Sequence, residues 1–174
     1  MNGRLGLALA RLALAVTVVV VGFVLFRDTV RHAEASAAVS FLHLLGANRI
    51  RLLSDSSVLV IPRTGSLFRV VVTPSCSALS AMLALAVLGL LTPRAPWRRR
   101  LGATAVAMMA VLAGNLMRIA ASLSAGTWAG RASLVLFHDW VGTMFTFASI
   151  LGGYVLMLYV LLPDRQPTPA LADV

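Results

Sequence analysis

Four long apolar runs divide this chain, and each is close to the length that an α-helix needs to cross a bilayer. Such a helix takes about 20 mostly apolar residues, and lipid offers no water to satisfy the backbone of any open structure. The pattern therefore predicts an all-α membrane protein, a four-transmembrane-helix bundle that forms a single integral membrane domain over residues 1–174. The predicted spans cover residues about 5–26, 76–91, 101–122 and 137–162.

The composition agrees with a lipid environment. The chain is 59% hydrophobic and 12% charged, whereas a soluble domain is about 45–50% apolar and about 25% charged. It carries 15 basic residues, all arginine, against 6 acidic ones, for a net charge of +9. Because these arginines flank apolar runs, we expect membrane lipids and no nucleic acid as partners. A single cysteine excludes an intramolecular disulfide and a cysteine-based zinc site.

Arginines between the second and third runs set the predicted orientation. The positive-inside rule places this cluster in the cytoplasm, with both termini. Residues about 27–75 and 123–137 then lie outside, although the first of these segments also carries six arginines. The first run is alternatively a signal peptide, cleaved near residues 33–37, but it exceeds the usual ~7–15-residue signal core. The cytoplasmic cluster consists of Arg94, Arg98, Arg99 and Arg100.

The outer segment 27–75 changes its periodicity along its length. Residues 29–46 carry apolar side chains at helical spacing (Val30, Ala33, Ala37, Phe41, Leu44 and Leu45) but are too short and polar to span, which predicts an interfacial helix. Residues 48–57 are polar and turn-prone. Two β-branched runs follow, at 57–61 and 67–72, and the Pro-Arg-Thr-Gly turn between them predicts a β-hairpin.

Two further segments lack helical signals. Residues 123–131 contain two glycines and predict a short external loop. The polar, proline-containing tail at 163–174 predicts disorder.

The predicted topology brings three reactive side chains to the outer membrane face. Cys76 begins the second span, Arg118 lies near the outer end of the third, and His138 begins the fourth. Each alone has a structural explanation. Cys76 can be an apolar filler, Arg118 can extend its charge to the membrane interface, and His138 can be an interfacial anchor. Together they suit acyl transfer, since an imidazole can deprotonate a thiol and later protonate a leaving amine. An arginine supplies fixed donors for an oxyanion.

Three short motifs around these residues are similar to those of a known family. A hairpin leads to Cys76-Ser77-Ala78, where the family has Cys-Ser-Gly at a helix start. Asn115 and Arg118 form Asn-x-x-Arg late in the next helix, and His138 precedes a glycine by four residues. In order and spacing, residues 57–162 resemble the exosortase/archaeosortase family of membrane transpeptidases.

The resemblance implies a function and a set of roles. Cys76 would attack a peptide bond near the C-terminus of a secreted protein and pass the acyl group to an acceptor amine or to water. Arg118 would stabilise the oxyanion and His138 would act as acid and base, with no metal or cofactor. Substrates would carry a C-terminal motif, a transmembrane helix and a basic tail. The enzyme would be a multi-pass plasma-membrane protein with its active site on the extracytoplasmic side.

Two neighbouring residues are candidates for supporting roles. Asn115 shares a helical face with Arg118, so it either orients that arginine or a carbonyl, or packs helices as a plain amide. Asp139 could orient His138 only if the backbone lets adjacent residues meet, since helical neighbours point apart.

The competing hypothesis is a non-enzymatic membrane assembly or scaffold protein, in which the cysteine only fills space. A membrane-impermeant thiol reagent separates the two hypotheses, because only an activated cysteine reacts rapidly at a pH below that of a free thiol.

Overall fold

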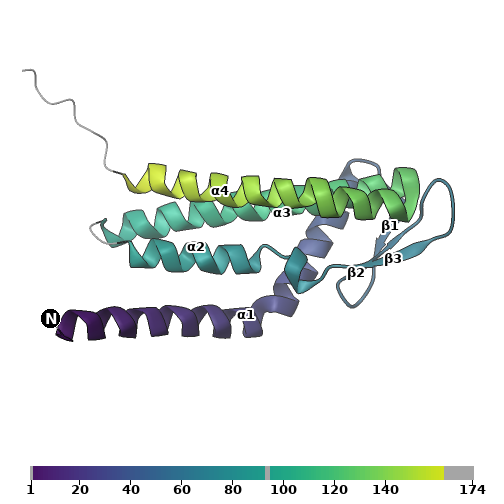
Figure 1. Cartoon of the computed structure of the whole chain (residues 1–174). Helices are drawn as coiled ribbons and strands as arrows, with labels where there is room; N and C mark the ends of the chain where they lie inside the picture. The colour runs from purple at the N-terminus through teal and green to yellow at the C-terminus, as the bar shows by residue number, and fades with distance from the viewer. Residues whose placement is uncertain (1, 93–94, 163–174) are drawn as a thin grey trace, which may run out of the picture.

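The computed structural model describes residues 2–92 and 95–162. The tail predicted to be disordered and Arg94 of the basic cluster lie outside the described residues. The described chain is mostly helical, with one small sheet (Figure 1). In chain order the elements are α1 (Asn2–Leu44), β1 (Ile50–Leu52), β2 (Ser57–Val60), β3 (Phe68–Val71), the 3₁₀ turn η1 (Pro74–Cys76), α2 (Leu79–Leu91), α3 (Trp97–Leu136), the π-helical turn η2 (Phe137–Val141) and α4 (Gly142–Leu161).

The helices lie side by side, and the sheet closes one end of them. Helix α3 contacts both α2 and α4, and α1 contacts α2 and α3. Figure 1 shows the sheet at the end of the bundle where α3 gives way to α4. Two helical stretches among the described residues, Leu12–Leu44 and Trp97–Leu161, are long and apolar enough to cross a membrane, while Leu79–Gly89 is apolar but shorter. Length and composition thus support a membrane protein.

Helix α1 is one continuous helix, which corrects the prediction of a span followed by a separate interfacial helix. No proline or glycine interrupts residues 23–45, and Asp28 pairs with Arg27 and Arg31, each at 3.6 Å. With no breaker at the predicted boundary, the helix continues. Figure 1 shows its second half turned away from the direction of the first.

The second half of α1 presents two apolar faces. The residues that the sequence predicts as membrane-facing, Phe41 and Leu44, are exposed. A different face packs into the protein, through Ala35, Ala38 and Leu42. Because apolar residues occur on both faces, the apolar spacing alone does not reveal the buried one.

The predicted β-hairpin is present as β2 and β3, which pair antiparallel with Val60 opposite Phe68. A third strand, β1, pairs with β2 and corrects the prediction that residues 48–57 form only turns. This strand forms because Ile50 is completely buried, and Ser56, with φ of 59°, turns the chain back into β2. The order β1-β2-β3 leaves β3 at an edge.

The connection between the third and fourth helices is far shorter than the predicted loop at 123–131. Helical structure continues through Trp128 and breaks only at Ala129 and Gly130. Gly130 has φ of 78°, a conformation that glycine adopts without steric cost. The fourth helical segment therefore begins before residue 137, and the chain reverses over two residues.

Two buried clusters meet at Cys76. The first joins α1, the sheet and the outer part of α3, and Cys76 packs against it. The second joins α2, α3 and α4 and includes Ala78. The turn between β3 and α2 is thus fixed on both sides.

Candidate active site

The turn that carries Cys76 is built by its local sequence. Strand β3 ends before Thr73, whose backbone is extended, and Pro74 then opens η1 with a φ that suits a helix start. The amide of Cys76 donates to the carbonyl of Thr73 at 2.9 Å. Helix α2 begins only at Leu79, so Cys76 precedes the helix, and its side chain is half-buried.

His138 lies against the thiol. Its Nε2 is 3.2 Å from Cys76 Sγ, across 62 residues of sequence. Its other ring nitrogen, Nδ1, is 3.1 Å from Oδ1 of Asp139. Neighbouring residues of an α-helix normally point apart. His138 and Asp139 instead lie in the π-helical turn η2, which is wound more widely than an α-helix, and there their side chains meet.

Arg118 reaches the same ring. Its Nη2 is 3.2 Å from His138 Nε2, and the residue is only 8% exposed, so it does not snorkel to the surface. Gly142 makes room for it, because a Cβ there would lie 2.9 Å from Arg118 Nε. No carboxylate among the described residues forms a salt bridge with Arg118.

These contacts assign the tautomer of His138 when its ring is neutral and the Cys76 thiol is protonated. An arginine can only donate, so Nε2 accepts from Arg118 and carries no proton. The ring proton then sits on Nδ1, where it is donated to Asp139. Nε2 therefore faces the Cys76 thiol as a base.

The thiol has an unusually low pKa for its surroundings. Burial raises the pKa of Cys76, but hydrogen bonds with His138 and Thr73 outweigh burial and lower it from 9.0 to about 7. The Thr73 hydroxyl contributes directly, with Oγ1 at 3.1 Å from Sγ. A large share of the thiol is therefore ionised at neutral pH.

A buried amide and a buried carboxylate hold the backbone around the thiol. Asn115 Nδ2 donates to the carbonyl of Cys76 at 3.0 Å and to Oε1 of Glu34 at 3.1 Å. The same Oε1 accepts from the amide of Ala78 at 2.9 Å. Asn115 thus binds the carbonyl of the turn that carries the thiol.

Glu34 and Thr73 are the site residues that the sequence analysis missed. Glu34 is 2% exposed, and its Oε2 is buried with no hydrogen-bond partner in the described part of the chain. In the predicted interfacial helix it falls outside the apolar positions. The available signal was its spacing, since Glu34 lies four residues before Ala38 on the face that is buried.

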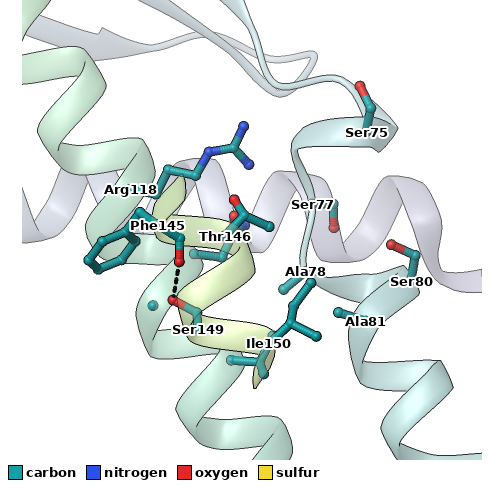
Figure 2. Close-up of a pocket in the computed structure, with 13 residues that line it drawn as sticks. Ser75, Ser77, Ala78, Ser80, Ala81, Arg118, Phe145, Thr146, Ser149 and Ile150 are labelled. Atoms are coloured by element: carbon teal, nitrogen blue, oxygen red, sulfur yellow. Dashed lines mark hydrogen bonds between the residues drawn. The ribbon is translucent and has the colours of Figure 1, made fainter. Parts of the chain in front are cut away.

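Several pockets border residues of the site. Cys76 and His138 border an apolar pocket of about 350 Å³ beneath β3. Arg118 and Ser77 border another of about 410 Å³ between α2 and α4 (Figure 2). Over the described ranges, no group of three or more His, Cys, Asp or Glu side chains is arranged to hold a metal ion.

Comparison with known proteins identifies the family. A family model described as transmembrane exosortase matches residues 1–156, most of the chain. No curated protein and no solved structure matched the sequence. We conclude that the chain belongs to the transmembrane exosortase family, which implies a membrane-bound cysteine transpeptidase that processes secreted proteins with C-terminal sorting signals.

Proposed function

We propose that this protein cleaves the C-terminal sorting signal of secreted proteins with Cys76 as nucleophile, then transfers the acyl group to an acceptor amine or to water. The observation that carries the proposal is one ring nitrogen, His138 Nε2, placed 3.2 Å from Cys76 Sγ and 3.2 Å from Arg118 Nη2. A base and an oxyanion donor thus meet beside the only cysteine of the chain.

The first half-reaction makes a thioester. The Cys76 proton moves to His138 Nε2, and the thiolate attacks the carbonyl carbon of the scissile peptide bond. The carbonyl π electrons move to oxygen, which forms a tetrahedral oxyanion. As this intermediate collapses, the C–N bond breaks and Nε2 returns its proton to the departing amine. The products are an S-acyl Cys76 and the released C-terminal segment.

The second half-reaction regenerates the thiol. An acceptor amine or water attacks the thioester while His138 Nε2 takes its proton. The C–S bond then breaks, and the sulfur takes the proton back from Nε2. Asp139, on Nδ1, orients the ring and offsets the imidazolium charge in both halves.

Arg118 changes partner during this cycle. In the resting site its Nη2 donates to the lone pair of His138 Nε2. Once Nε2 is protonated, that acceptor is lost and a cationic ring faces the guanidinium. Arg118 is then free to donate to the substrate oxyanion, which forms at the same stage. The proton transfer therefore releases the donor when the charge to be stabilised appears.

We also propose the predicted arrangement of four spans, namely the first part of α1 together with α2, α3 and α4. Helix α4 has 20 residues, or about 30 Å, the thickness of a bilayer core. Its far end is bound by the basic cluster, since Arg99 donates to the carbonyls of Val160 and Leu162, each at 2.6 Å. The site and the sheet lie at the opposite end, on the extracytoplasmic side of the plasma membrane.

Thiol labelling tests this proposal. Right-side-out vesicles that contain the full chain would be treated with a membrane-impermeant maleimide at pH 7, with Cys76→Ser as the cysteine-free control. Rapid labelling without permeabilisation supports an activated, outward-facing thiol. Labelling no faster than that of glutathione, whatever the permeabilisation, would favour the scaffold hypothesis instead.

Processing tests the reaction itself. An exported protein with a C-terminal motif, span and basic tail would be coexpressed with the native chain or Cys76→Ser. The native chain should shorten the substrate and form a hydroxylamine-sensitive acyl adduct, and the variant should do neither. Equal shortening by both would exclude Cys76 as the nucleophile.

A further inference from the structure

The pocket between α2 and α4 adjoins the turn that carries the thiol, since Ser75 and Ser77 line it. Its walls are the first turn of α2 and the second turn of α4, and α3 forms its floor. Figure 2 shows Thr146 and Ser149 on one side and Ser77, Ala78 and Ala81 on the other. Because α2 and α4 contact each other little, a gap remains between them above α3.

This pocket continues the proposed active site. Ser77 and Ala78 follow Cys76 directly in sequence, and Arg118 belongs to both the pocket and the site. The thiol itself borders the other pocket, under β3. If a substrate peptide bond lies at Cys76, the substrate chain on one side of that bond would extend toward the sheet. The chain on the other side would extend toward this inner pocket.

The lining of the inner pocket is small and uncharged. Among the described residues, Arg118 is the only charged one that borders it, and alanines and hydroxyl side chains form most of its walls. The hydroxyls of Thr146 and Ser149 donate to backbone carbonyls of their own helix, each at 2.8 Å. Their oxygens keep free lone pairs, so they can accept hydrogen bonds but have no spare proton to give.

Such a lining fits the start of a helix. The first N–H groups of an α-helix have no partner within the helix, and in lipid each of them needs an acceptor. The hydroxyl oxygens of Thr146 and Ser149 supply acceptors at this depth. Small side chains suit the incoming segment, because the whole pocket holds about 410 Å³ and the larger side chains of Phe145 and Ile150 also line it.

We propose that the inner pocket is the subsite for the residues just C-terminal to the scissile bond, and that it takes an uncharged segment with small side chains at the start of the substrate's transmembrane helix. This inference rests on the proposed function: in an exported substrate cleaved at this site, the mature part would lie outside, toward the sheet, and the span would lie in the membrane. The pocket then selects substrates by the side-chain size of that first turn.

Alkylating probes test the subsite without a known substrate. The full chain in detergent would react with iodoacetamide, N-iodoacetyl-Ala-Ala-amide and N-iodoacetyl-Lys-Lys-amide, and the rate of Cys76 modification would be measured by mass spectrometry. We expect the Ala-Ala probe to react about tenfold faster than iodoacetamide, because its methyl groups enter an apolar pocket. The Lys-Lys probe should show no such gain.

Two blocking variants and a matched control locate the effect. Ala81→Leu fills the pocket from α2, and Ser80→Leu narrows it from an exposed position that tolerates a larger side chain. Ala84→Leu adds the same group at an exposed position of the same helix, outside the pocket. The ratio of the Ala-Ala rate to the iodoacetamide rate should fall to about one in both blocking variants and keep its native value in Ala84→Leu.

The outcomes separate the subsite from the proposed function. A missing Ala-Ala gain, or one that survives both blocking variants, would overturn the subsite whatever the thiol's own reactivity. If plain iodoacetamide modifies the native thiol no faster than glutathione at pH 7, the proposed function fails instead.

Discussion

Replacing His138 by asparagine should raise the pKa of the Cys76 thiol by about two units. In the native protein burial raises this pKa, yet it lies at about 7 rather than 9.0, and the hydrogen bond from His138 is the largest lowering cause. Asparagine remains polar but cannot carry a positive charge, so the variant keeps the burial and retains only Thr73 as a partner. We therefore expect a pKa of about 9 or above in the variant.

Two opposing effects determine the change in reaction rate. At pH 7 a thiol with a pKa of about 7 is about half ionised, whereas one with a pKa near 9 is about 1% ionised, a ~50-fold difference. The intrinsic nucleophilicity of a thiolate falls as its pKa falls, with a Brønsted coefficient of about 0.4–0.5. Over two pKa units the native thiolate is therefore ~6–10-fold less nucleophilic than the thiolate of the variant. The native protein should therefore react ~5–8-fold faster at pH 7 and more slowly above about pH 8, where the two curves cross.

The assay is iodoacetamide modification of the full chain between pH 6 and 10, followed by mass spectrometry. His43→Asn is the matched control, because it removes a different histidine hydrogen bond, 2.7 Å long, to the carbonyl of Ile50. Its profile should follow that of the native chain. Parallel curves for the native chain and His138→Asn, with a common midpoint, would refute an activating role for His138.

Three further substitutions probe the rest of the site. Arg118→Lys keeps the charge but loses the planar fork, so substrate processing should fall about 10²–10³-fold; an unchanged rate would make Arg118 a structural residue. Gly142→Ala places a Cβ 2.9 Å from Arg118 Nε, and the displaced guanidinium should lower processing about tenfold or more, with iodoacetamide modification changed little. Glu34→Leu should destabilise the protein by about 1–3 kcal/mol, measured as a lower unfolding midpoint in detergent, because Ala78 N and Asn115 lose their acceptor. Glu34→Gln keeps an acceptor oxygen and should stay closer to the native midpoint, and equal losses in the two variants would contradict this explanation.

The meeting of Cys76, Arg118 and His138 could be predicted because it follows from topology. Successive membrane helices alternate direction, so a residue at the start of one helix and another at the end of the next lie at the same face. Apolar runs and charge bias are strong signals in sequence, and they place the start of α2 and the end of α4 to within a few residues. These side chains do meet in the structure. His138 Nε2 lies 3.2 Å from Cys76 Sγ and 3.2 Å from Arg118 Nη2.

Contacts that depend on local winding or on distant packing could not be predicted. The bond between His138 and Asp139 accompanies a π-helical turn, which no residue pattern announces. Glu34 reaches Ala78 only because the second half of α1 packs into the protein by a face that the sequence does not single out. Strand β1 was missed because three residues are too few for a clear alternation.

The buried polar atoms without partners also bear on the choice between enzyme and scaffold. Among the described residues they are Arg118 Nε, Glu34 Oε2 and Arg31 Nε. Two of the three belong to side chains that hold the turn of Cys76 or contact its base. A purely structural protein gains nothing from such atoms, since each unsatisfied buried group costs about 1–3 kcal/mol. A site that binds a substrate instead requires donors and acceptors without partners in the protein, and here two of them lie around one ionisable thiol.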